Sequence, residues 1–277
     1  MQFIIFDDII THIYHLEPIM RIVIKIGTST LTHKTGNLNI RHIEDLCKVT
    51  SDLKNAGHEI ILVSSGAIGM GVGKLGLSAR PTDMPTKQAA AAVGQCELMY
   101  FYDKLFSEYN HTVGQILITG EDLANEERRG NFESTIERLL QLRVLPVINE
   151  NDTVSTDEIK VGDNDTLAAI VATVTKSNLL ILLSDIDGLF TADPRKDPTA
   201  TLIPDVFDLG EEILSLAGDA GSALGTGGMK TKLNAAKLCT SHGTDMVITN
   251  GEHPEYLYDI AEGKPIGTKF HCPKVKI

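Results

Sequence analysis

The stretch GTGGMKTK (225–232) combines two residue types that a phosphate site needs. Its three glycines leave the backbone free of side chains, so it can approach an anionic ligand closely. Lys230 and Lys232 add positive charge, and a helix expected to begin near Met229 would point its free N–H groups at the loop. The pattern predicts a phosphate-binding loop, although it lacks the Walker A motif and also fits a flexible loop with solvated lysines.

A second lysine stands at the end of an apolar strand, in KIGTSTL (25–31). A lysine within an apolar strand loses hydration unless it meets an anion. Its side chain could instead extend past the sheet edge into solvent. We favour an anion site around Lys25, because the glycine and the hydroxyl groups that follow it also suit an anion.

Acidic residues gather in two stretches, NEND (149–152) and KVGDNDTLAA (160–169). Asp163, Asn164 and Asp165 precede an expected helix, and one of them should be its N-cap. Two carboxylates around one amide exceed what a cap requires. They could orient a lysine, hold a metal ion or accept a ligand ammonium group.

The elements that must position these residues follow an alternating pattern. Short, continuously apolar runs predict strands over 21–26, 59–63, 113–119, 144–148, 179–184 and 245–249. Between them lie amphipathic runs that predict helices near 40–56, 86–109, 131–143, 164–176 and 229–242, and the polar segment 153–161 predicts a hairpin. Alternating strands and helices predict an α/β fold, a three-layer αβα sandwich with a mainly parallel central sheet.

The polar stretches fall where such a sheet binds ligands. GTST (27–30), SSGAIGMG (64–71), NEND and SDIDG (184–188) each follow an expected strand. Ligands of open α/β sheets bind beyond the carboxyl ends of the strands. We therefore expect these stretches to share one site.

Composition limits the partners of this site. The chain of 277 residues has a formal net charge of -12, which disfavours nucleic acid and anionic lipid. No run reaches the roughly 18 apolar residues of a membrane span, and the four scattered cysteines predict reduced thiols in a cytoplasmic protein. We expect residues 1–19 to be an extension of unknown role and 20–277 to form a single domain.

Other catalytic patterns are weak. GVGKLG (71–76) matches the dinucleotide pattern GxGxxG, but it does not follow its strand directly. The nine histidines form no metal spacing or convincing triad, and GxSxG is absent.

Taken in order, KIGTSTLT, SSGAIGMG, AAVGQ, VLPVINEND, IKVGDNDTLAA, LFTADPR and GTGGMKTKL resemble the glutamate 5-kinases of the amino-acid kinase superfamily. The resemblance extends over about residues 20–271. Many members carry a C-terminal PUA domain, whereas this sequence ends soon after GTKF (267–270) and resembles the short form without a PUA domain. Residues 1–19 match nothing in the family pattern.

The resemblance implies ATP-dependent phosphorylation of the side-chain carboxylate of L-glutamate to L-glutamyl 5-phosphate, the first step of proline biosynthesis. It implies that Lys25 and Lys232 are catalytic lysines at the transferring phosphoryl group. Asp165 would hold both lysines in place and keep them protonated. Rival activities are phosphorylation of carbamate, N-acetylglutamate or aspartate, or amino-acid sensing without catalysis.

The same resemblance implies the binding residues. Ser65, Asp152 and Asn164 match the glutamate-binding positions. The expected ATP-binding residues are Lys25, Ser184, Asp185, Gly225, Thr226, Gly227, Gly228, Met229, Lys230, Thr231 and Lys232. Mg²⁺ would be held mainly through the ATP phosphates, with protein ligands unassigned. Feedback inhibition by proline and a homodimer or tetramer are further expectations of the family.

Overall fold

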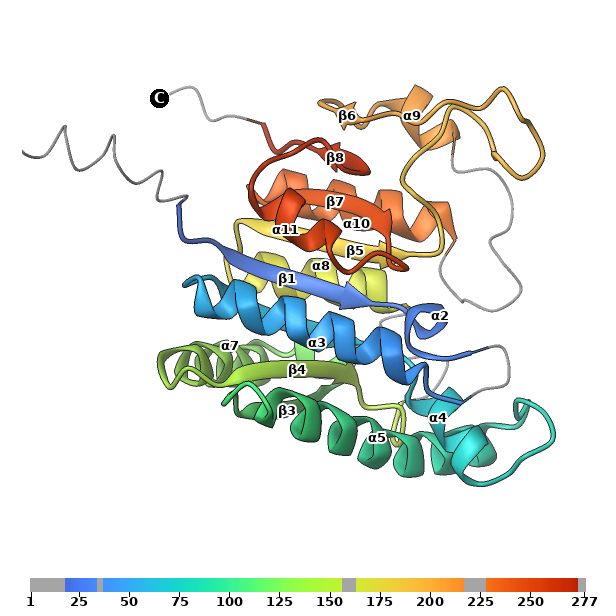
Figure 1. Cartoon of the computed structure of the whole chain (residues 1–277), viewed down its shortest axis with the longest axis vertical. Helices are drawn as coiled ribbons and strands as arrows, with labels where there is room; N and C mark the ends of the chain where they lie inside the picture. The colour runs from blue at the N-terminus through green and yellow to red at the C-terminus, as the bar shows by residue number, and fades with distance from the viewer. Residues whose placement is uncertain (1–17, 34–36, 156–162, 217–227, 274–277) are drawn as a thin grey trace, which may run out of the picture.

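The computed structural model describes residues 18–33, 37–155, 163–216 and 228–273. Within these ranges eight strands form one sheet in the order β3-β4-β2-β1-β5-β7-β8-β6 (Figure 1). The strands are β1 (Arg21–Ile26), β2 (Glu59–Ser64), β3 (Val113–Ile118), β4 (Leu145–Glu150), β5 (Leu179–Ser184), β6 (Asp205–Val206), β7 (Asp245–Asn250) and β8 (Thr268–Phe270). Strands β1 to β5 and β7 run parallel, and β8 pairs antiparallel with β7, so the mainly parallel sheet is confirmed.

Helices cover both faces of this sheet. They are α2 (Thr28–Leu31), α3 (Ile40–Asn55), α4 (Ala67–Lys74), α5 (Met84–Ser107), α6 (Gly120–Ala124), α7 (Glu126–Gln141), α8 (Asn164–Val174), α9 (Glu211–Ser215), α10 (Met229–Ser241) and α11 (Tyr256–Ala261). In Figure 1, α3 and α11 lie in front of the sheet, and α8 and α10 lie behind it. The three-layer αβα arrangement is therefore confirmed.

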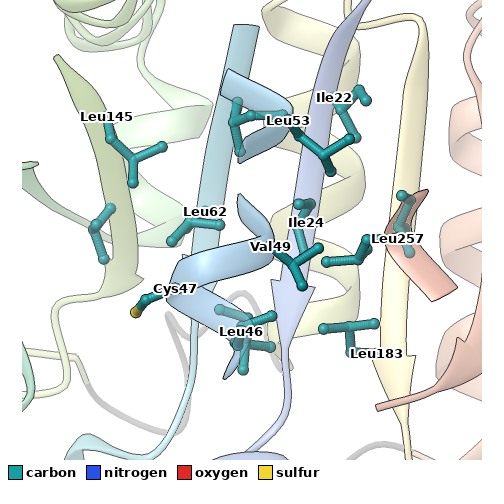
Figure 2. Close-up of a cluster of buried hydrophobic side chains, with 14 of the residues drawn as sticks. Ile22, Ile24, Leu46, Cys47, Val49, Leu53, Leu62, Leu145, Leu183 and Leu257 are labelled. Carbon is teal, nitrogen blue, oxygen red and sulfur yellow. The ribbon is translucent and has the colours of Figure 1, made fainter. Parts of the chain in front are cut away.

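Side chains alternate between two cores, one on each face of the sheet. Ile22 and Ile24 of β1 pack on one face with Leu46, Val49 and Leu53 of α3 (Figure 2). The residues between them point to the other face, where α7, α8 and α10 pack. Burial on both faces explains why these strands are continuously apolar rather than alternating.

This alternation determines where Lys25 points. Val23 packs in the core that faces α8 and α10. Lys25 lies two residues further along β1 and so shares that face. Lys25 is the last residue of β1 on this face, so its ammonium group lies near the carboxyl end of the strand and on the side of α8 and α10.

The expected strands and long helices form, with shifted ends. Helix α7 begins at Glu126 rather than 131, because the Asn125 side chain caps it by accepting from the Arg128 N–H (3.0 Å). The sequence patterns missed the shorter helices α2, α4, α6, α9 and α11 and the short strands β6 and β8. Most of the predicted hairpin at 153–161 and most of the extension at 1–19 lie outside the described residues.

Candidate active site

A cavity lies at the carboxyl ends of β1, β2, β4 and β5, where the sequence predicted a shared site. Gly27, Ser65, Glu150 and Ser184, which lie at or directly after these strand ends, all line it. The polar stretches after the four strands therefore do meet at one edge of the sheet. We call this space the first cavity.

Three charged side chains meet at the base of the first cavity. Lys25 comes from β1, Asp165 from the first turn of α8 and Lys232 from the first turn of α10. Lys25 Nζ lies 2.7 Å from Asp165 Oδ1, and Lys232 Nζ lies 3.0 Å from Asp165 Oδ2. One carboxylate thus holds two lysines from separate elements.

All three members of this cluster are buried. Asp165 is 1% exposed, Lys232 6% and Lys25 9%. Burial raises the pKa of the Asp165 carboxyl, but the charges of Lys25 and Lys232 lower it by more, so that its pKa is about 2. The carboxylate is therefore ionised at any pH near neutrality, and the cluster carries one net positive charge when both lysines are charged.

Local structure orients Asp165. The Asp163 side chain caps α8 by accepting from the backbone N–H groups of Asp165 and Thr166, both at 2.9 Å. Asp163 is therefore the N-cap among the three candidates. Because it takes the capping role, the Asp165 carboxylate is available to the lysines, and the Thr231 hydroxyl adds a contact at 3.0 Å to Oδ2.

The predicted acceptor residues line the same cavity. Asn164 Nδ2 donates to Ser65 Oγ (2.7 Å) and to the Ser64 carbonyl (3.1 Å), which joins the start of α8 to the loop after β2. Asp152 lines the cavity from the loop after β4. Gly66 is the N-cap of α4 and has a φ of 99°, a left-handed conformation that favours glycine, and both it and Ala67 at the start of α4 line the cavity.

A second cavity adjoins the first. Its lining includes Asp187, Phe190, Pro194 and Met229, and it shares Ser184, Asp185 and Lys232 with the first cavity. Of the predicted nucleotide-binding residues, Gly228 also lines it. Lys232 therefore lies where the two cavities meet, within reach of ligands in both.

The remaining residues predicted to bind ATP differ in their positions. Lys25 lines the first cavity, and Thr231 contacts Asp165. Lys230 is exposed and lines neither cavity. Gly225, Thr226 and Gly227 lie outside the described residues.

Sequence reasoning missed several polar residues of the two cavities. Thr28 and Arg80 line the first cavity, and Arg195 and Asn250 line the second. Two of them could have been predicted: Thr28 lies in GTST directly after an expected strand, and Arg195 is the last residue of the motif LFTADPR. Asn250 directly follows the expected strand at 245–249, which was a similar signal, whereas Arg80 had no comparable pattern around it.

The glycine pattern GVGKLG is a packing feature. Gly71 lies inside α4, and a Cβ atom there would fall 1.8 Å from the carbonyl oxygen of Ala90 in α5. The pattern lies in a helix rather than in a strand-to-helix turn, so it lacks the geometry of a dinucleotide site.

The described residues offer little direct support for a metal ion. Among them, no three His, Cys, Asp or Glu side chains are grouped so that they could hold one. Asp165 is committed to two lysines. The site fits an ion that arrives on a ligand and keeps most of its own oxygen ligands, which is how Mg²⁺ usually binds with phosphates.

Solved structures share this fold. A carbamate kinase from Giardia lamblia bound to AMP-PNP superposes with a TM-score of 0.67 at 18% identity, covering 93% of this chain and all of that one. An isopentenyl phosphate kinase from T. acidophilum superposes with a TM-score of 0.62 at 19% identity, covering 91% of this chain and all of that one. At these identities the likeness establishes the fold alone.

Sequence comparison identifies the family. A profile of the amino acid kinase family matches residues 20–250. A glutamate 5-kinase from Clostridium tetani is 54% identical over 260 residues, which cover 94% of this chain and 97% of that protein. One from Clostridium perfringens is 50% identical over 263 residues, covering 94% of this chain and 98% of that protein. The chain belongs to the amino acid kinase family and, within it, to the glutamate 5-kinases.

Proposed function

We propose that this protein transfers the γ-phosphoryl group of ATP to the side-chain carboxylate of L-glutamate, forming L-glutamyl 5-phosphate for proline biosynthesis. The observation that carries the proposal is the Lys25–Asp165–Lys232 cluster, because Lys232 lines both cavities. A phosphoryl group that passes from a ligand in one cavity to a ligand in the other would meet this lysine. The glutamate 5-kinase relatives supply the identity of the acceptor.

The charges of the cluster suit phosphoryl transfer to a carboxylate. Lys25 and Lys232 can contact the phosphoryl oxygens, where negative charge is spread in the transition state. Asp165 fixes both ammonium groups before the substrates arrive, so little reorganisation is needed during the reaction. When bound, Mg²⁺ would neutralise part of the charge of the nucleotide phosphates.

No general base is required. A glutamate side chain has an ordinary pKa of about 4.3 and is already ionised near neutrality. Among the described residues that line the two cavities there is no histidine. Catalysis then depends on positioning and charge neutralisation, and both cavities offer groups for these roles.

The first cavity suits the amino acid. The Asp152 carboxylate suits the α-ammonium group, and the Ser65 hydroxyl with the backbone N–H groups at the start of α4 suits a carboxylate. Asn164 bonds to Ser65 at 2.7 Å and so supports the same pocket.

The second cavity suits the nucleotide. The apolar surfaces of Phe190, Pro194 and Met229 suit a base. No side chain caps the start of α10 at Gly228, which suits phosphate binding by the backbone of this turn.

Regulation, assembly and location are parts of the same proposal. Proline resembles the backbone of glutamate and is expected to inhibit by feedback, and the active form is expected to be a homodimer or tetramer. All four cysteines are free thiols, which supports a reducing, cytoplasmic location. Among the described residues, no helix is both long enough and apolar enough to cross a membrane.

An ATP-dependent hydroxamate assay tests the function. Hydroxylamine traps an acyl phosphate, and L-glutamate is compared with aspartate and N-acetylglutamate in the presence of Mg²⁺. We expect hydroxamate with L-glutamate alone. Signal only with another acid would overturn the acceptor, and folded protein without signal for any acid would favour amino-acid sensing.

A further inference from the structure

A buried glutamine lies behind the first cavity, in the motif AAVGQ that the proposed chemistry leaves without a role. Gln95 of α5 is 7% exposed, and it lines neither cavity. Its Oε1 accepts a hydrogen bond from Asn149 Nδ2 at 2.9 Å. Asn149 is 3% exposed and lines the first cavity.

Asn149 connects this glutamine to the acceptor pocket. Its Oδ1 accepts from the Glu150 backbone N–H (2.9 Å) and from Asn164 Nδ2 (3.1 Å). Asn164 Nδ2 in turn donates to the Ser64 carbonyl and to Ser65 Oγ. A chain of three amides therefore runs from α5 through the end of β4 to the start of α8.

Backbone groups fix the direction of each amide in this chain. A backbone N–H can only donate, so the atom of Asn149 that meets the Glu150 N–H must be the oxygen. A carbonyl can only accept, so the atom of Asn164 that meets the Ser64 carbonyl must be the nitrogen. Asn149 Nδ2 must then point away from Asn164, where it needs a buried acceptor, and Gln95 Oε1 is that acceptor.

The result is a free oxygen at the cavity. Asn164 uses its nitrogen toward the protein, and its Oδ1 accepts no hydrogen bond from the described residues. Asn164 lines the first cavity together with Asp152. An amide oxygen and a carboxylate in the lining of one cavity suit a ligand ammonium group, which has three donors and no acceptor.

The Gln95 amide nitrogen gives a second, independent observation. Gln95 Nε2 is buried and has no hydrogen-bond partner among the described residues. A buried donor without a partner is costly and uncommon, and a hydrophobic side chain would avoid that cost. The residue type is therefore explained by its acceptor oxygen rather than by core packing.

We propose that Gln95 is a positioning residue: by accepting from Asn149 Nδ2 it holds Asn149, and through it Asn164, in place, so that Asn164 Oδ1 receives the α-ammonium group of the amino-acid substrate. The inference rests on the proposed function, because it concerns the acceptor of that same site. Helix α5 would then contribute to substrate recognition indirectly, through the hydrogen bond from Asn149 to Gln95.

Kinetics of Gln95→Met in the full chain test this. Methionine keeps similar size but removes the acceptor oxygen, so Asn149 Nδ2 loses its partner. We expect KM for L-glutamate to rise about tenfold, equivalent to about 1.4 kcal/mol, while KM for ATP stays within twofold. Thr50→Val is the matched control, because Thr50 on α3 is fully buried and its hydroxyl has no hydrogen-bond partner in the part of the chain that the structure describes, and this change should leave both KM values unchanged.

A double-mutant cycle separates positioning from general destabilisation. In an Asn164→Ala background the amide chain is already broken, so adding Gln95→Met should change KM for L-glutamate by less than twofold. Additive effects, or equal rises in both KM values, would overturn the proposal. If Gln95→Met does not fold, Gln95→Asn withdraws the acceptor by one methylene and should give the same pattern.

Measurements on the wild-type protein distinguish failure of the proposed function from failure of the proposed role of Gln95. Absence of ATP-dependent glutamate phosphorylation in the wild type would defeat the proposed function. A wild type that phosphorylates glutamate, with a Gln95→Met variant of unchanged glutamate KM, would defeat only the role of Gln95.

Discussion

At the scale of single residues, the site depends on one carboxylate that serves two lysines. Asp165 is 1% exposed, so its charge is stable only because both lysines lie within 3.0 Å. Removing the carboxylate would leave two buried ammonium groups without a counter-charge. The stability of the fold and the proposed catalytic role therefore depend on the same residue.

Asp165→Asn should lower the free energy of unfolding by about 3 kcal/mol or more at pH 7, because it leaves buried charges unpaired. The pKa of Asp165 is about 2 in the folded protein, below the ordinary value of about 3.9. Its contribution is thus fully present above about pH 4 and is lost as pH falls from about 4 to 2. Urea unfolding of both proteins between pH 7 and pH 3 measures this, and a difference that grows on acidification would contradict it.

Asp152→Ala should raise KM for L-glutamate by tenfold or more, because a charge-assisted bond to the ammonium group contributes about 1.5–3 kcal/mol. Turnover at saturation should change little. Steady-state kinetics give both values, with Asp208→Ala as the control, since Asp208 is an exposed carboxylate that lines neither cavity. An unchanged KM would move the ammonium site away from Asp152.

At the scale of elements, helices α4 and α5 touch backbone to backbone behind the acceptor pocket. A Cβ atom at Gly94 of α5 would lie 1.7 Å from the carbonyl oxygen of Ala67, the first residue of α4. Ala67 also lines the first cavity. The close crossing therefore determines where the start of α4 lies relative to the first cavity.

Gly94→Ala should destabilise the fold by about 1–3 kcal/mol or more, because the helices must separate, and it should weaken glutamate binding. Gly130→Ala in α7 is the matched control, since nothing lies within 4 Å of its added Cβ. That change should stabilise the protein by about 0.5–1 kcal/mol. Urea unfolding and glutamate KM of both variants test the contrast, and equal behaviour would refute it.

The elements also show what the sequence could predict. The continuously apolar runs predicted the parallel strands correctly, because strands that are buried on both faces are apolar at every position. Helix α4 was not predicted, because the glycines of GVGKLG are typical of a loop. Gly71 instead allows close packing against α5, which only the tertiary structure shows. Strands β6 and β8 have only two and three residues, too few for a periodic pattern.

The site was predictable to a similar degree. Lys25 and Lys232 stood out because a charge in an apolar strand or beside a glycine-rich loop needs an explanation, whereas only the family resemblance singled out Asp165. From residue type and spacing alone Asp163 and Asp165 could not be told apart, since either could cap α8 and only the structure gives the capping role to Asp163. Arg80 comes from a loop whose path no local pattern determines.

At the scale of the whole molecule, the sheet brings two cavities together at one edge. They share Ser184, Asp185 and Lys232, and each has a lining of its own. Under the proposed function, a nucleotide and an amino acid would bind in separate cavities and meet where these three shared residues lie.

Separate binding predicts separate stabilisation. A non-hydrolysable ATP analogue and L-glutamate should each raise the melting temperature, with about 2.7 kcal/mol of stabilisation at a hundred times the Kd. In Asp152→Ala the effect of glutamate should shrink and that of the analogue should remain. Loss of both effects in thermal unfolding would show that the two cavities do not act as separate sites.

The most direct test of the account is the turnover of Lys232→Ala, measured with glutamate binding to the same protein. Lys232 lies where the cavities meet, so we predict a fall in kcat of about 100-fold or more with glutamate affinity retained. Lys237→Ala, an exposed lysine on the same helix, should keep normal turnover. Near-normal turnover in Lys232→Ala would remove this lysine from the mechanism and contradict phosphoryl transfer through the cluster.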